Sequence, residues 1–151
     1  AAAIDGLILT AGTIYVVFFA HDFLGPFQSF LITLGVPLAA WAGILIADIL
    51  TRRADYDEHA LFDANGRYGS IDWVSILTLV VCSIIGWGLV VNNFAEAAAW
   101  NNWQGYLLGP IGGRKGDWAF ANLGVLLALV LGFLVTLVLR RGTIRRQEMG
   151  Q

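Results

Sequence analysis

The residues with chemically reactive side chains are few, and most lie in short polar segments between long apolar stretches. His21 and His59 are isolated in the sequence, and the single cysteine, Cys82, excludes an internal disulfide and a cysteine-based metal cluster. Glu96 and Asp117 have no histidine or nucleophile beside them at a spacing that would form an acid–base pair. We therefore expect no catalytic residues, no metal site and no resident cofactor, and the sequence predicts that the protein is not an enzyme.

The composition indicates what kind of protein surrounds so few polar groups. Of 151 residues, 58% are hydrophobic and only 13% are charged, whereas a soluble domain carries about 25% charged residues. The formal net charge of −2 and the absence of a basic face give no electrostatic basis for binding nucleic acid. Because backbone exposed to lipid must be hydrogen-bonded internally, the expected class is an all-α, polytopic membrane protein.

Four apolar stretches reach the length that crosses a bilayer core, roughly 20 residues of helix. The short connection at residues 21–26 predicts that the first two form an antiparallel hairpin, and residues 51–72 form a polar loop. The connection at residues 92–117 is mixed, and its residues 94–103 are expected to lie as a short helix in the membrane interface. The four predicted transmembrane helices cover residues 1–20, 27–50, 73–91 and 118–139.

The distribution of Lys and Arg predicts the orientation in the membrane. Seven of these residues lie in the 51–72 loop and the tail at 140–151, whereas two lie in the 92–117 connection. Cytoplasmic loops carry the excess of Lys and Arg. We therefore expect a multi-pass protein of the plasma (cytoplasmic) membrane, with the loop containing Arg52 and the C-terminal tail in the cytoplasm and residues 92–117 outside.

One charged pair lies at a spacing at which helical side chains meet. Asp48 precedes Arg52 by four residues, an arrangement that contributes about 0.2–0.5 kcal/mol on an exposed helix and more when half-buried. Arg52 and Arg53 follow the end of an apolar span, where positive charge interacts favourably with the helix C-terminus and with anionic headgroups. Together with Tyr56 and Asp57 they predict a cytoplasmic anchor and loop structure, not a binding site.

The second predicted span has two further features. Ala39, Gly43 and Ala47 are spaced four apart, so they share one helix face on which another helix can approach closely in lipid. Gly35 and Pro37 predict a kink or break near residues 34–35, because proline removes a backbone donor and clashes with the preceding turn. Discontinuous helices build gates in secondary transporters, but a bend can also be purely architectural.

The segment that follows this face carries short motifs in a fixed order. In order, these motifs are Gly43, Ala47 and Asp48, then Arg52-Arg53, Tyr56-Asp57, Leu61-Phe62 and Gly66-Arg67-Tyr68-Gly69. The segment resembles the end of the tenth helix and the next cytoplasmic loop of nucleobase–cation symporters, which carry cytosine, purines, uracil, allantoin, hydantoins and some vitamins. Ile49 departs from the family pattern, where an aromatic residue is common, and leaves the subfamily open.

The resemblance implies a fold and a function for the larger protein. Family members have twelve helices, the first ten forming two inverted repeats of the LeuT-like type, so this chain would be a partial transporter domain comprising helices nine to twelve. It would belong to a secondary active transporter that imports nucleobases or related compounds by cation symport through alternating access. Its partners would be the lipid bilayer, the remaining N-terminal helices of the transporter and a small nucleobase-like substrate.

The resemblance also assigns a role to the second span. In the family the tenth helix is a flexible outer gate, whereas substrate and the coupling cation, sodium or proton, bind mainly to helices one, three, six and eight. Gly35 and Pro37 would then form the hinge, and Phe27, Phe30 and Leu31 would cover a planar ligand. The alternative is a small four-helix membrane protein with a structural or assembly role, and upstream coding sequence for about eight further spans would decide between the two.

Overall fold

The computed structural model describes residues 2–19, 24–63, 66, 68–92 and 103–149. Every regular element in this part of the chain is helical, so the predicted all-α class is confirmed. The α-helices are α1 (Ala2–Phe19), α2 (Leu24–Thr51), α3 (Glu58–Leu61), α4 (Trp73–Gly88), α5 (Leu123–Leu139) and α6 (Arg141–Met149). Short 3-10 helices cover Gly109–Ile111, Gly113–Lys115 and Asp117–Phe120.

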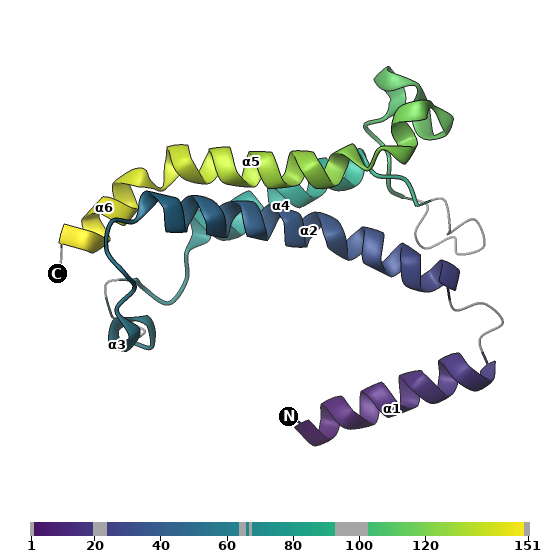
Figure 1. The fold of residues 1–151 in the computed structure, drawn as a ribbon, viewed down its shortest axis with the longest axis horizontal. Helices are drawn as coiled ribbons and strands as arrows, with labels where there is room; N and C mark the ends of the chain where they lie inside the picture. The colour runs from purple at the N-terminus through teal and green to yellow at the C-terminus, as the bar shows by residue number, and fades with distance from the viewer. Residues whose placement is uncertain (1, 20–23, 64–65, 67, 93–102, 150–151) are drawn as a thin grey trace.

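Three long helices form the packed body of the molecule. Helices α2, α4 and α5 lie side by side, and each contacts the other two (Figure 1). Helix α1 lies apart from them, and its described side chains are exposed although most are apolar. The short helices α3 and α6 lie at one end of the body, and the 3-10 helices lie at the other end (Figure 1). The core is therefore a three-helix unit with polar caps.

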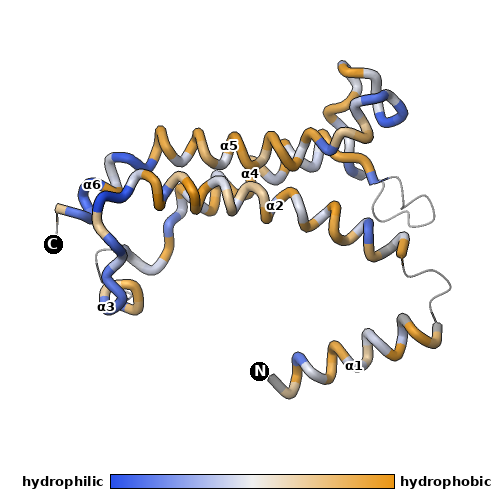
Figure 2. Tube along the Cα trace, in the orientation of Figure 1, coloured by the Kyte–Doolittle hydropathy of each residue, from blue (hydrophilic) through white to orange (hydrophobic). Residues whose placement is uncertain are grey.

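The hydropathy of this body is consistent with a membrane setting for at least one helix. Apolar residues run along α2, α4 and α5, whereas polar residues gather at the two ends (Figure 2). Among the described residues, Phe27–Thr51 is long and apolar enough to cross a bilayer, with a mean hydropathy of 2.2. Helices α5 and α6 reach the length and apolarity of a membrane span only if they are taken together as one span with a 54° bend. Ala3–Tyr15 and Trp73–Gly88 are apolar helices of shorter length. The arrangement of four spans therefore remains a prediction.

Two helix starts differ from the sequence-based expectation. Helix α2 begins at Leu24, so Pro26 lies in its first turn, where a missing N–H removes no intrahelical hydrogen bond. Helix α5 begins at Leu123, after Asn122 adopts a left-handed backbone with φ of 49°, a conformation that asparagine tolerates better than most residues. Residues 21–23 of the turn expected at residues 21–26, and residues 94–102 of the interface helix expected at residues 94–103, lie outside the described residues.

Small residues bring α5 close to its two neighbours. Gly124, Ala128, Gly132 and Thr136 are spaced four apart on α5, and all are buried. A Cβ atom added at Gly124 would collide with the carbonyl oxygen of Gly86 on α4, and one added at Gly132 would lie 2.6 Å from the carbonyl oxygen of Ala40 on α2. Close packing of helix backbones therefore holds the body together.

Candidate functional site

Pro37 leaves one carbonyl of α2 without its usual helical donor, and a neighbouring helix supplies the replacement. In a regular helix the amide at position 37 would donate to the carbonyl of Thr33, but proline has no N–H. The indole Nε1 of Trp87 on α4 donates to this carbonyl at 2.8 Å. Helix α2 is continuous through this position, so the structure shows no break at residues 34–35.

Further neutral hydrogen bonds surround this carbonyl. The hydroxyl of Thr33 donates to the carbonyl of Ser29 at 2.8 Å and accepts from Nε2 of Gln104 at 2.9 Å. The hydroxyl of Ser29 donates to Oδ1 of Asn92 at 2.8 Å. We call Ser29, Thr33, Trp87, Asn92 and Gln104 the Thr33 cluster. Through it, the N-terminal half of α2 is attached to α4 and to the segments that flank residues 93–102.

The Thr33 cluster retains hydrogen-bonding capacity that the described residues do not use. Asn92 is 5% exposed and Gln104 is 1% exposed. Nδ2 of Asn92 and Oε1 of Gln104 have no partner within the described part of the chain.

The predicted gate residues lie on the same half of α2. Phe27, Phe30 and Leu31 are each exposed over roughly half of their surface, at 42%, 53% and 48%. A Cβ added at Gly35 would meet no atom within 4 Å, so the side of α2 at Gly35 is open, although the adjacent Val36 is fully buried. The structure thus places all five predicted gate residues on one helix, with the aromatic side chains outside the core and Pro37 beside the Thr33 cluster.

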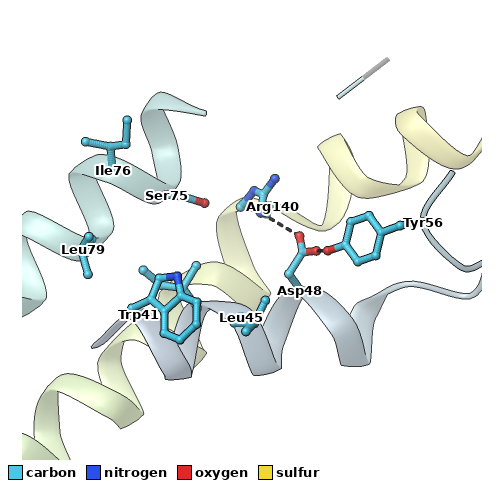
Figure 3. A pocket seen from close by; sticks show the side chains of 9 residues that line it. Trp41, Leu45, Asp48, Tyr56, Ser75, Ile76, Leu79 and Arg140 are labelled. Carbon is cyan, nitrogen blue, oxygen red and sulfur yellow. Dashed lines mark hydrogen bonds and ion pairs between the residues drawn. The ribbon is translucent and has the colours of Figure 1, made fainter. Parts of the chain in front are cut away.

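The C-terminal end of α2 holds a buried ionic group centred on Asp48. This carboxylate is 5% exposed; Oδ2 accepts from Nε of Arg52 at 2.8 Å, and Oδ1 accepts from Nη1 of Arg140 at 2.7 Å. The phenol of Tyr56 also donates to Oδ2. Nε of Arg140 lies 2.9 Å from Oδ2 of Asp72, an ion-pair distance without hydrogen-bond geometry. We call Asp48, Arg52, Tyr56, Asp72 and Arg140 the Asp48 cluster, and Figure 3 shows Asp48 with Tyr56 and Arg140.

Two aromatic rings support Arg52 within this group. The guanidinium carbon lies 4.3 Å from the ring centre of Tyr56 and 5.4 Å from that of Tyr68, distances at which a cation is attracted to the ring face. Nη2 of Arg52 donates to Oε1 of Gln147 on α6 at 3.0 Å. The cluster therefore connects α2, the following loop, α4, α5 and α6.

The charges of the cluster shift the pKa values of two of its loop members. Burial alone would lower the pKa of the Arg52 guanidinium, but hydrogen bonds to Asp48 and Tyr56 together with coulombic attraction raise it above its ordinary value. Partial burial and the hydrogen bond to the Asp48 carboxylate raise the pKa of the Tyr56 phenol. At neutral pH the Tyr56 phenol therefore stays protonated and donates its hydrogen bond, and Arg52 stays charged.

The remaining family-motif residues shape the loop. Asp57 caps α3 by accepting from the backbone amides of His59 and Ala60, and its own amide donates to the phenol oxygen of Tyr68 at 3.2 Å. A Cβ added at Gly66 would lie 3.0 Å from the carbonyl oxygens of Ala60 and Asp63. Structurally, these residues fold the loop, and none of them lines a deep cavity.

A shallow hollow of about 290 Å³ lies beside the Asp48 cluster, between α2 and α4. Figure 3 shows Asp48, Tyr56 and Arg140 meeting at its polar end, while Trp41 and Leu79 supply apolar walls. Its polar groups already satisfy one another, and the described residues contain no group of His, Cys, Asp or Glu placed to hold a metal ion. The geometry favours a structural contact over a reaction.

The predicted packing face of α2 is partly rearranged. Gly43 and Ala47 are buried, and a Cβ at Gly43 would collide with the carbonyl of Leu129 on α5. Ala39 is only half-buried, whereas its neighbour Ala40 is fully buried. The buried face follows a spacing of four and three residues, because a helix has 3.6 residues per turn and a strict spacing of four drifts around its axis.

Arg53, which the sequence groups with Arg52, has a different environment. It is exposed, and its side chain is not part of the Asp48 cluster. Sequence reasoning missed Arg140, Asp72, Trp87 and Gln104. Arg140 and Asp72 flank apolar spans just as Arg52 does, which is a weak signal that they meet at the same end of the helices. Nothing in the sequence indicates that Trp87 pairs with Thr33.

Comparison with known proteins gives a distant and partial similarity. The chain is similar to the "Putative purine-cytosine permease YxlA" of Bacillus subtilis (strain 168), with 25% identity over 79 residues that cover 52% of this chain. The matched segment covers 17% of the permease, so the chain spans a small part of that protein's length. No protein-family profile matches the chain. No solved structure matches it either.

Proposed function

We propose that this chain is the C-terminal part of a secondary active transporter that imports nucleobases or related compounds by cation symport. The observation that carries the proposal is the similarity to a purine-cytosine permease over 79 residues. The apolar composition and a helix long enough to cross a bilayer support a membrane transporter. In this proposal the four spans are the last four of twelve, and substrate and cation bind to helices that precede this chain.

Within such a transporter, the N-terminal half of α2 is the moving part of an outer gate. Three features of the described residues support this role: Pro37 frees the carbonyl of Thr33, Gly35 has open space around it, and neutral hydrogen bonds hold the outer half in place. Neutral contacts of this kind contribute about 0.5–1.5 kcal/mol each, so several can break and reform in a transport cycle.

Uptake by the full-length protein tests the proposed activity. The gene is expressed in cells that lack nucleobase uptake, and accumulation of labelled cytosine, purines, uracil, allantoin and hydantoin is measured. We expect saturable uptake of one of these classes that stops when the sodium or the proton gradient is dissipated. Absence of uptake for all of them, or uptake that is indifferent to both gradients, would contradict the proposal.

The gate is tested by stiffening α2. Replacing Gly35→Ala and Pro37→Ala together restores the helical donor for Thr33 and reduces backbone freedom. We expect the uptake rate to fall while equilibrium binding of the substrate changes much less, because the binding groups lie on other helices. Uptake equal to that of the wild type would show that Pro37 is architectural and that α2 is not a gate.

A further inference from the structure

A second hollow, next to Arg52 of the Asp48 cluster, is lined by positive charge. Its volume is about 300 Å³, and it lies between the C-terminal end of α2 and the bend from α5 into α6. Arg52 and Arg53, just after α2, and Arg141 and Arg145 on α6 contribute its charged wall. Leu50 and Leu137 contribute an apolar wall.

Three of the four arginines that line this hollow form no ion pair within the described part of the chain. Arg52 and Arg140 pair with Asp48, whereas no carboxylate lies within ion-pair distance of Arg53, Arg141 or Arg145. The one acid in the lining, Glu148, accepts through Oε1 from the backbone amides of Arg53 at 2.6 Å and of Ala54 at 3.3 Å, and the charges of Arg52 and Arg53 help to lower its pKa. Four arginines therefore line the hollow together with a single carboxylate.

The start of α6 adds to this excess of positive charge. The N-terminus of a helix carries a partial positive charge and favours acidic residues in its first turn. Helix α6 has no acidic residue there and begins with Arg141. The 54° bend between α5 and α6 brings this unfavourable start next to the end of α2. A bound anion would neutralise both the helix end and the arginines.

The apolar wall indicates which anion fits. Leu50 is 68% exposed, and Leu137 on α5 is partly buried. Figure 2 shows the colour changing from orange to blue where α5 passes into α6, so the hollow lies at the boundary between the apolar body and its polar end. Arginines on one side and leucines on the other match a molecule that has an anionic head and a hydrocarbon tail.

We propose that this hollow binds one anionic phospholipid, with Arg53, Arg141 and Arg145 around the headgroup phosphate and an acyl chain along Leu50 and Leu137. Guanidinium groups bind phosphate through short charge-assisted hydrogen bonds, and basic pockets between helices on the cytoplasmic side bind lipid headgroups. The lipid would hold α6 against the end of α2, next to the Asp48 cluster. This inference rests on the membrane setting of the proposed function, but not on the identity of the transported substrate.

The test uses the full-length protein in nanodiscs that contain phosphatidylcholine and phosphatidylglycerol, followed by transfer to detergent and native mass spectrometry to measure retained lipid. Arg145→Gln and Arg146→Gln are matched variants, because the residues are adjacent and exposed but only Arg145 lines the hollow. We expect wild type to retain phosphatidylglycerol selectively, and Arg145→Gln to lower its affinity about five-fold, as for removal of one charge near a membrane surface. Arg146→Gln should leave retention unchanged, and Arg141→Gln with Arg145→Gln should lower it further.

Three results would overturn the site. Equal retention of phosphatidylcholine and phosphatidylglycerol would show that the arginines do not select an anionic lipid. An equal loss of phosphatidylglycerol in Arg145→Gln and Arg146→Gln would show only a general attraction of the lipid to the basic surface of the protein. Displacement of phosphatidylglycerol by inorganic phosphate would assign the hollow to a free anion. Because lipid retention is measured without substrate, selective retention by a protein that imports no nucleobase would leave this site standing and remove only the proposed transport activity.

Discussion

The two ends of α2 are held by different kinds of interaction. At the C-terminal end, Asp48 is buried among two guanidinium groups and a phenol, and Gly43 is in close contact with α5. At the N-terminal end, Thr33 is held by neutral hydrogen bonds from Trp87 and Gln104, and the space beside Gly35 is open. One continuous helix thus has a C-terminal half with buried charge and close backbone contact, and an N-terminal half that is held by neutral hydrogen bonds and is open beside Gly35.

This difference indicates which half of α2 moves if the helix bends. Removing one partner of a buried ion pair costs about 3–5 kcal/mol, whereas a neutral hydrogen bond contributes about 0.5–1.5 kcal/mol. Motion about Pro37 that breaks the Thr33 cluster therefore requires less free energy than motion that breaks the Asp48 cluster. If α2 bends about Pro37, we therefore expect the C-terminal half to stay fixed and the N-terminal half to be displaced.

The largest expected effect comes from removing the charge of the fixed end. Asp48→Asn leaves Arg52 buried without a carboxylate and leaves Arg140 with Asp72 alone, so we expect the free energy of unfolding of the full-length protein to fall by about 3–5 kcal/mol. Chemical denaturation in detergent measures this loss. Asp55→Asn, at an exposed acid of the same loop, should change stability by less than about 0.5 kcal/mol. Similar values for the two variants would show that Asp48 is not a buried ionic centre.

The packing difference along α2 is tested by adding one methyl group to each half. At Gly43 the new Cβ collides with the carbonyl of Leu129, so Gly43→Ala should cost about 1–3 kcal/mol of stability. At Gly35 the space is empty, so Gly35→Ala should stabilise the helix by about 0.5–1 kcal/mol. The same denaturation measurement compares them. Changes of the same sign would contradict the assignment of a close-packed and an open half.

We expect the hydrogen bond from Trp87 to Thr33 to contribute less to the free energy of unfolding than the Asp48 cluster or the contact at Gly43. Trp87→Phe removes the donor to a carbonyl that Pro37 has already deprived of its helical partner, so stability should fall by about 1–2 kcal/mol. In a Pro37→Ala background, the restored backbone amide of residue 37 donates to the same carbonyl of Thr33. The loss of stability caused by Trp87→Phe should then be smaller. A double-mutant cycle measures this coupling. Strict additivity would mean that Trp87 does not replace the missing donor.

The smallest effect concerns pH at the fixed end. Hydrogen bonds from the backbone amides of Arg53 and Ala54 lower the pKa of Glu148 below its ordinary value. The folded pKa is therefore below the unfolded pKa, so the contribution is complete above the unfolded pKa and is lost as pH falls through the folded pKa. The difference in Tm between wild type and Glu148→Gln should be present at neutral pH and disappear in acid. If the Tm difference persists in acid, its cause is the packing of the Glu148 side chain and not its charge.

The sequence predicted those parts of the candidate sites that depend on local spacing. Asp48 and Arg52 are four residues apart on one helix, so their pairing follows from helix geometry alone. Gly43 and Ala47 were assigned to a packing face for the same reason. Ala39 was assigned to this face as well, but Ala40 is the buried residue, because the position of the contact face around the helix axis depends on the partner helix. The roles of Gly35, Pro37 and the aromatic residues as a gate stay predictions.

The sequence by itself determined the all-α class, the positions of the apolar helices and the Asp48–Arg52 pair, because apolar length and helical periodicity are properties of neighbouring residues. Only the tertiary structure decided that Arg140, 92 residues from Asp48, completes the ionic cluster. It likewise decided that Trp87 replaces the donor that Pro37 lacks. Such contacts depend on how far each helix rotates and slides against its neighbours. That arrangement is set by close packing of small residues such as Gly124 and Gly132 along the whole interface, and no local pattern encodes it.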